Sequence, residues 1–141
     1  MRKFIVCFLS LFLSSCALNL IDYVSLESAT PVKGVTLHDG DSISVVVQYN
    51  CNETSSQFYV SADLRDKNDN IVTINAVTYG LVNHNGTVTL KGVFHLTNYD
   101  YNSSMLVYSP PYTIELAVGY YIADLSFYQD ASYDMENNYY N

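Results

Sequence analysis

The feature of this sequence that most restricts its fold is a repeated alternation of apolar and polar residues with a period of two. In residues 42–49 the apolar side chains occupy alternate positions: Ile43, Val45, Val47 and Tyr49. The alternation returns in residues 58–64, 87–96, 112–118 and 121–127, and residues 71–79 form a strand of less clear facing. Because successive side chains of a strand point to opposite faces, each run predicts a strand with one buried face. Such strands must bury that face against another sheet.

Turn-forming residues separate these runs, in residues 38–41, 65–70 and 83–86. Glycine and asparagine tolerate a positive φ, and Asp and Asn side chains bond to their own backbone. Asn85-Gly86 between two runs predicts a hairpin. We therefore expect an all-β fold, a single Greek-key sandwich of two sheets with about seven antiparallel strands.

A chain of 141 residues is long enough for one domain and its core, so it needs no disulfide framework. We expect a signal peptide in residues 1–16, a tether in 17–31 and the sandwich in 32–129. Residues 130–141 are acidic and rich in tyrosine and asparagine, which predicts a frayed tail, the alternative being a last edge strand through Tyr133.

The first residues have the layout of a secretory signal peptide. Arg2 and Lys3 precede an apolar run over residues 4–13, and small residues follow it. The run is too short to span a bilayer unless Leu18, Leu20 and Ile21 are counted with it, which would give a marginal uncleaved anchor.

Leu13-Ser14-Ser15-Cys16 resembles the lipobox of bacterial lipoproteins. The resemblance covers only the signal region. It implies that a diacylglycerol is attached to the Cys16 sulfur, that cleavage occurs before Cys16, and that the new amino terminus is acylated. In the alternative, an ordinary secretory signal, Cys16 is discarded with the signal. Under both readings Cys51 is expected to be a small buried apolar residue. If Cys16 were instead retained without a lipid, it could pair with Cys51.

The chain is acidic, with a formal net charge of -8. Removal of the signal leaves Lys33, Arg65, Lys67 and Lys91 as the basic residues against fourteen acids. Such a field repels phosphate backbones and anionic lipid, so we expect no nucleic-acid partner and membrane contact through a lipid anchor only.

The sequence shows no catalytic constellation, so we do not expect an enzyme, a cofactor or a metal. The histidines His38, His84 and His95 fall in two turns and on a polar strand face, without cysteines or acids at metal-ligand spacing. Glu115 and Asp124 could form an acid pair but resemble ordinary outward carboxylates. Calcium ligands could come from Asp63, Asp66 and Asp69, or from Asp39 and Asp41.

Residues 119–123, Gly-Tyr-Tyr-Ile-Ala, resemble the corner that leads into a late strand of immunoglobulin-like and fibronectin type III-like domains. The resemblance implies that the hydroxyl of Tyr121 bonds back to the backbone. The chain lacks the core tryptophan and the cysteine pair of antibody domains, so a barrel or a jelly roll remains an alternative.

The long connection over residues 98–112 is rich in tyrosine, serine and asparagine, the residues that antibody loops use for contact. It predicts a disordered or crossover loop whose tyrosines lie on the neighbouring sheet, the alternative being a binding loop with Tyr99, Tyr101, Tyr108 and Tyr112. Glycosylation sequons occur at Asn52, Asn85 and Asn102 and matter if the source is eukaryotic.

These features predict an exported, non-enzymatic binding or structural protein. The leading hypothesis is a surface lipoprotein of the cell envelope with one immunoglobulin-like domain that binds a protein or a glycan. The alternative is a secreted, unanchored adhesion or matrix protein of the extracellular space. A small extracellular enzyme is a weaker third hypothesis.

Overall fold

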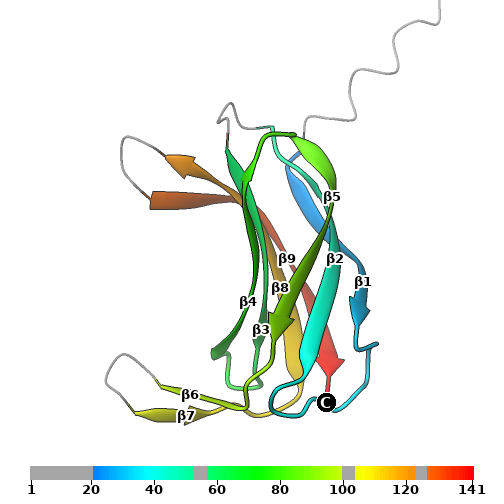
Figure 1. Cartoon of the computed structure of the whole chain (residues 1–141), viewed down its shortest axis with the longest axis vertical. Coiled ribbons are helices and arrows are strands. Elements are labelled where there is room, and N and C mark those ends of the chain that lie inside the picture. Colours follow the sequence, from blue (N-terminus) through cyan, green and yellow to red (C-terminus); the bar gives the residue numbers. More distant parts are fainter. Residues whose placement is uncertain (1–20, 53–56, 100–103, 123–126) are drawn as a thin grey trace, which may run out of the picture.

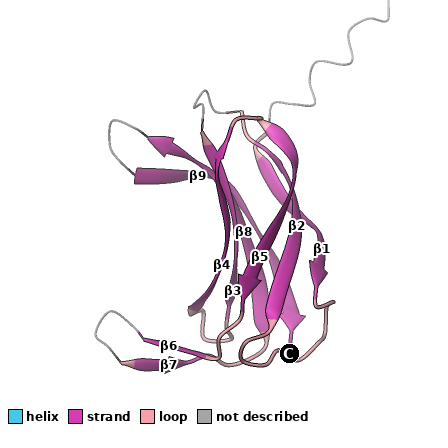
Figure 2. Cartoon of the chain, in the orientation of Figure 1, coloured by secondary structure: helices cyan, strands magenta, loops and turns pink. Residues whose placement is uncertain are grey.

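The computed structural model describes residues 21–52, 57–99, 104–122 and 127–141, and the side chains of these residues outside 121–131. Within these ranges the chain forms nine strands and no helix (Figure 2). The strands are β1 (Tyr23–Thr30), β2 (Ser42–Asn50), β3 (Phe58–Arg65), β4 (Ile71–Leu81), β5 (Asn85–Val93), β6 (Thr97–Tyr99), β7 (Met105–Val107), β8 (Tyr112–Ile122) and β9 (Phe127–Tyr140).

Seven of these strands build two antiparallel sheets that pack against each other (Figure 1). The three-stranded sheet has the order β1-β2-β5, and the four-stranded sheet has the order β4-β3-β8-β9. Strands β6 and β7 form a separate two-stranded ribbon at one end. The predicted all-β fold with two packed sheets is therefore confirmed.

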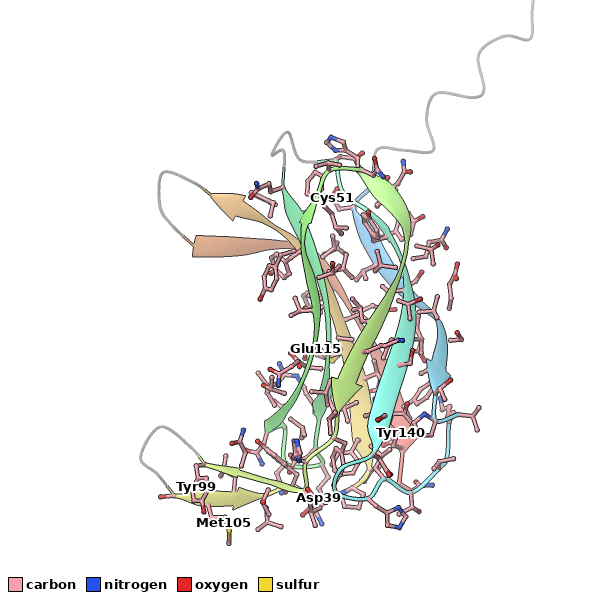
Figure 3. The ribbon with its side chains drawn as sticks, in the orientation of Figure 1. Asp39, Cys51, Tyr99, Met105, Glu115 and Tyr140 are labelled. Atoms are coloured by element: carbon pink, nitrogen blue, oxygen red, sulfur yellow. The ribbon has the colours of Figure 1, made fainter. Side chains whose placement is uncertain are left out.

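The core lies between the two sheets and follows the alternation in the sequence. In β3, for example, every second side chain is buried, and the same holds for most of β2 and β8. The largest fully buried side chains are Phe58, Phe94, Tyr112 and Tyr140. Cys51 is also fully buried, as predicted, and its side chain lies at the end of the sandwich where β1 begins (Figure 3).

The expected tether over residues 17–31 is wrong for its second half, because residues 23–30 form β1 at the edge of the three-stranded sheet. Its register with β2 shifts between Leu26 and Ser28. Such a bulge breaks the period of two, and this explains why the sequence pattern does not reveal the strand.

The expected tail over residues 130–141 is also wrong, because β9 pairs with β8 almost to the end of the chain. The last residues are fixed by residues 31–37. The Gly34 N–H donates to the Tyr139 carbonyl (2.7 Å), and the buried Tyr140 hydroxyl donates to the Pro31 carbonyl (2.9 Å). The partners are more than one hundred residues apart, so no local pattern signals this edge strand.

Two local predictions around turns differ from the structure. Asn85-Gly86 does not close a hairpin, because β4 pairs with β3 while β5 pairs with β2 in the other sheet. No new strand begins at Tyr121 either: its backbone continues β8 and pairs with Tyr128. The Tyr121 side chain lies outside the described residues, so its hydroxyl bond stays a prediction.

Candidate functional site

An irregularity in β4 creates the most distinctive local geometry of the four-stranded sheet. Ala62 of β3 pairs with Ala76, and Leu64 pairs with Val72, so residues 73–75 lie opposite the single residue Asp63. Such a bulge interrupts the ladder and re-aims side chains, and bulges are frequent next to functional sites. The outer face of β3 and β4 at this bulge is therefore the candidate functional site.

Three residues from three strands accommodate this bulge. A carboxylate oxygen of Asp63 accepts the Ile74 N–H at 3.2 Å, in place of a ladder partner. Asn75 has a φ of 57°, a left-handed conformation that asparagine tolerates better than most residues. At Gly92 of β5 an added Cβ would overlap the Ile74 carbonyl oxygen, so only glycine allows this approach. The bulge is therefore encoded by the sequence.

Two shallow surface pockets meet at the bulge, and Thr73 and Asn75 line both of them. The first has a volume of about 300 Å³ and follows the outer faces of β3 and β4. Its lining also includes Tyr59, Ser61, Asp63 and Tyr79. The second has a volume of about 250 Å³ and is lined further by His95, Thr97, Asn98 and Tyr108. We call the two together the bulge groove.

Two tyrosines form one end of the bulge groove. The ring centroids of Tyr59 and Tyr79 lie 6.2 Å apart, and Tyr79 is 58% exposed. The Tyr59 ring packs against Gly119 of β8, where an added Cβ would overlap ring atoms. This close approach fixes the Tyr59 ring against the sheet.

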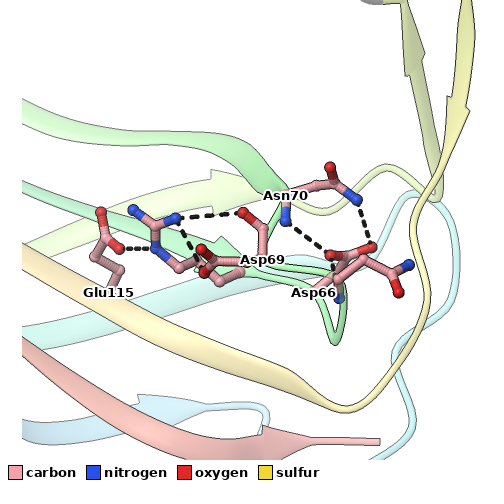
Figure 4. Close-up of polar contacts among 6 residues, drawn as sticks. Asp66, Asp69, Asn70 and Glu115 are labelled. Atoms are coloured by element: carbon pink, nitrogen blue, oxygen red, sulfur yellow. Dashed lines mark hydrogen bonds and ion pairs between the residues drawn. The ribbon is translucent and has the colours of Figure 1, made fainter.

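The charges beside the groove are mainly negative. Asp63 lies directly opposite Glu115 in the register. Burial raises the pKa of Asp63, the Ile74 hydrogen bond opposes this rise, and the Glu115 charge adds to it. Arg65 forms ion pairs with Glu115 and with Asp69, so its positive charge is compensated (Figure 4).

The turn between β3 and β4 holds another carboxylate, Asp66, which is buried where Asp63 is half-buried. It accepts the backbone N–H and the side-chain amide N–H of Asn70 (2.9 and 3.1 Å; Figure 4). It also accepts the backbone N–H groups of Asn68 and Ser109 (2.8 and 3.3 Å). Burial alone would raise the pKa of Asp66, but these hydrogen bonds together lower it. Asp66 therefore ties the β3–β4 turn to the segment before β8.

The β6–β7 ribbon borders the groove, since Thr97 and Asn98 of β6 line its second pocket. The base of the ribbon is fixed: the Leu96 N–H donates to Asp39 (2.8 Å) and the Tyr108 N–H to the Leu96 carbonyl (3.0 Å). In Figure 1 the ribbon and the far end of the β8–β9 pair project to the same side of the sandwich. Tyr99 and Met105 lie exposed on the ribbon (Figure 3).

The structure separates the four tyrosines of the predicted binding loop. Tyr99 is 70% exposed, and Tyr101 lies outside the described residues. Tyr108 and Tyr112 are 4% and 2% exposed, and the Tyr112 ring packs 5.1 Å from that of Phe94. Both fill the core end of the crossover into β8, as a crossover loop predicts, so the binding-loop alternative is wrong for these two residues.

The other predicted site residues are dispersed. Cys16, Asn102 and Asp124 lie outside the described residues, while Asn52 and Asn85 are exposed at the end where β1 begins. The three histidines are exposed. In the described ranges, no three His, Cys, Asp or Glu side chains come close enough to hold a metal ion. In the predicted calcium set, each carboxylate has a different partner. Asp63 accepts the Ile74 N–H at the bulge, Asp66 accepts the Asn70 N–H within the turn, and Asp69 contacts Arg65.

Comparisons with known proteins do not assign the chain. No protein-family model matches it, and no significant match was found among curated proteins or solved structures. Within the described ranges, no helix has the length and apolar character needed to span a membrane.

The sequence did not single out the bulge groove. It indicated residues 71–79 only as a strand of unclear facing, and the bulge is the reason, because it breaks the alternation at residues 73–75. Irregular facing within an otherwise regular strand pattern was the signal that could have drawn attention to Asn75.

Proposed function

We propose that this protein is an exported, lipid-anchored binding protein without catalytic activity, built on one immunoglobulin-like sandwich. The observation that carries the binding role is the bulge groove, a recessed polar and aromatic surface that three strands cooperate to shape. Strain and irregular backbone of this kind collect at functional sites.

The groove chemistry supports recognition rather than catalysis. Its polar side chains are hydroxyls, amides, the exposed His95 and one carboxylate, Asp63, which already accepts the Ile74 N–H. A hydrolytic site needs a nucleophile or base held toward a reacting atom. Hydroxyl and amide groups beside the exposed Tyr79 and the half-buried Tyr59 are suited to binding instead.

The strand order supports an immunoglobulin-like topology. Strands β2 and β5 are neighbours in one sheet, and β3 and β8 are neighbours in the other. The chain therefore passes between the sheets after β2, after β4 and after β5, as Greek-key sandwiches do.

The anchor rests on the lipobox-like residues 13–16. β1 begins at Tyr23, seven residues after Cys16, and seven residues span at most about 25 Å. An acylated Cys16 would hold the end that carries Asn50, Cys51 and His84 near the bilayer. The bulge groove would then face sideways, and the β6–β7 ribbon would lie at the end of the sandwich farthest from the membrane.

Metabolic labelling with a palmitate analogue tests the anchor on the full chain. We expect label in the wild type and in the matched control Cys51→Ala, and none in Cys16→Ala, which loses the acceptor sulfur. An unlabelled wild type that is secreted into the medium would contradict the anchor and favour the unanchored adhesion or matrix protein.

A further inference from the structure

We propose that the bulge groove binds a neutral saccharide. The inference deepens the proposed binding role and rests on it, but it does not depend on the lipid anchor. It follows from the shape, the hydrogen-bonding groups and the charge of the groove.

The shape suits a small, hydroxyl-rich chain that lies along a surface. The two pockets of about 300 and 250 Å³ share Thr73 and Asn75, so they form one continuous path across β4 to the ribbon. The lining contains tyrosine but no Trp, Phe, Met or Arg, the other residues that anchor protein interfaces, and of its aliphatic residues Ala76 is buried and Val77 is half-buried. A protein partner would therefore find few anchors here besides the two tyrosines.

The polar side chains of the bulge groove can form hydrogen bonds with the hydroxyl groups of a saccharide. Ser61, Thr73 and Asn75 carry short side chains that can both donate and accept, as saccharide hydroxyls do. The left-handed backbone of Asn75 places this amide at the boundary of the two pockets. Short side chains lose little rotamer entropy when they are ordered by a ligand.

Tyr59 and Tyr79 supply the apolar contact surface for a sugar ring. A sugar ring has faces made of C–H groups, and aromatic rings offer large rigid contact area for them at low entropic cost. The Tyr59 ring is held by its packing on Gly119, and Tyr79 lies beside it with more than half of its surface exposed. This pair therefore forms a preorganised aromatic surface, the tyrosine platform, at one end of the groove.

The charged side chains in and beside the bulge groove favour a neutral ligand over an anionic one. Asp63 is a lining residue of the first pocket, neither pocket has a lysine or arginine in its lining, and the nearby Arg65 is paired with Glu115 and Asp69. An anionic ligand would meet the Asp63 carboxylate, with Glu115 opposite it, and the one lining side chain that can carry a positive charge, His95, lies 3.6 Å from the Asp39 carboxylate. Phosphate, sulfate and uronate groups are therefore disfavoured.

The test is an array of neutral, uronate and sulfated oligosaccharides probed with the detergent-extracted full chain, followed by titration calorimetry with the best neutral oligosaccharide. We expect binding of neutral oligosaccharides. Tyr79→Ala, which removes the platform ring, and Asn75→Gly, which keeps the backbone freedom but removes the amide, should each weaken it by about tenfold or more.

Tyr133→Ala is the matched control, because Tyr133 is 68% exposed on β9 and is not in the lining of either pocket. It should bind as the wild type does, and thermal melting should show that all variants are folded. The inference is overturned if folded wild-type protein binds no neutral oligosaccharide, prefers uronate or sulfated chains, or binds equally well after both substitutions. Palmitate labelling judges the anchor separately from these outcomes.

Discussion

Asp63 combines two roles at the residue scale, since it closes the β4 bulge and lies in the groove wall. Its carboxylate accepts the Ile74 N–H, yet burial and the facing Glu115 make the charged form unfavourable. An amide at this position could accept the same hydrogen bond without a charge. The residue is therefore a sensitive probe of how the bulge is held.

We predict that Asp63→Asn is more stable than the wild type at neutral pH. A carboxyl whose pKa is raised by folding stabilises the protein fully below its unfolded pKa, about 3.9, and this contribution is lost as the pH rises through the folded pKa. The higher free energy of unfolding of Asp63→Asn should therefore disappear in acid. Urea denaturation from neutral pH down to the unfolded pKa measures this difference, with a change at the exposed Glu27, Glu27→Gln, as control. A variant that is less stable than the wild type at neutral pH would refute this role.

Gly92 tests the bulge from the opposite sheet. Gly92→Ala adds a Cβ that overlaps the Ile74 carbonyl oxygen, and the rigid backbone cannot yield as a side chain would. We expect a loss of about 1 to 3 kcal/mol in the free energy of unfolding. Denaturant titration beside Val93→Ala, a change at an exposed neighbour, measures it. An unchanged midpoint would show that the two strands do not approach as described.

At the scale of elements, β9 contributes more than its composition indicates. It is an edge strand of the four-stranded sheet, and its last residues bond to residues 31–37. Tyr140 is fully buried, its hydroxyl donates to the Pro31 carbonyl, and burial raises the pKa of this hydroxyl. The end of the chain is therefore part of the core.

We predict that Tyr140→Phe lowers the free energy of unfolding by about 1 to 2 kcal/mol, because the Pro31 carbonyl loses its donor. Tyr133→Phe, at an exposed position of the same strand, should change it by less than about 0.5 kcal/mol. Thermal and chemical denaturation compare the two variants. Equal stability of both would show that residues 130–141 behave as the tail that the composition predicts.

The elements differ in how far the sequence predicts them. The regular strands β2, β3 and β8 follow the alternation, because each has one face on the core. Bulges break the period in β1 and β4, and β9 depends on pairing with β8 and on contacts with residues 31–37. The bulge groove was missed for the same reason, since Asp63, Asn75 and Gly92 meet only once three strands are assembled.

At the scale of the whole molecule, the proposed anchor and the fold together define an orientation. The short distance in sequence between Cys16 and Tyr23 would keep one end of the sandwich at the bilayer. The acidic domain would be repelled by anionic lipid, which favours contact through the acyl chains alone. The bulge groove would then stand clear of the membrane surface and be open to a ligand.

The intact mass of the protein extracted from membranes is the sharpest test of the proposed lipid anchor. We expect a chain that begins at Cys16 and carries a mass increment of a diacylglycerol and a further acyl group. More than one chain is expected because a single chain anchors only weakly. An unmodified chain that begins after Cys16 and is recovered from the soluble fraction would contradict it.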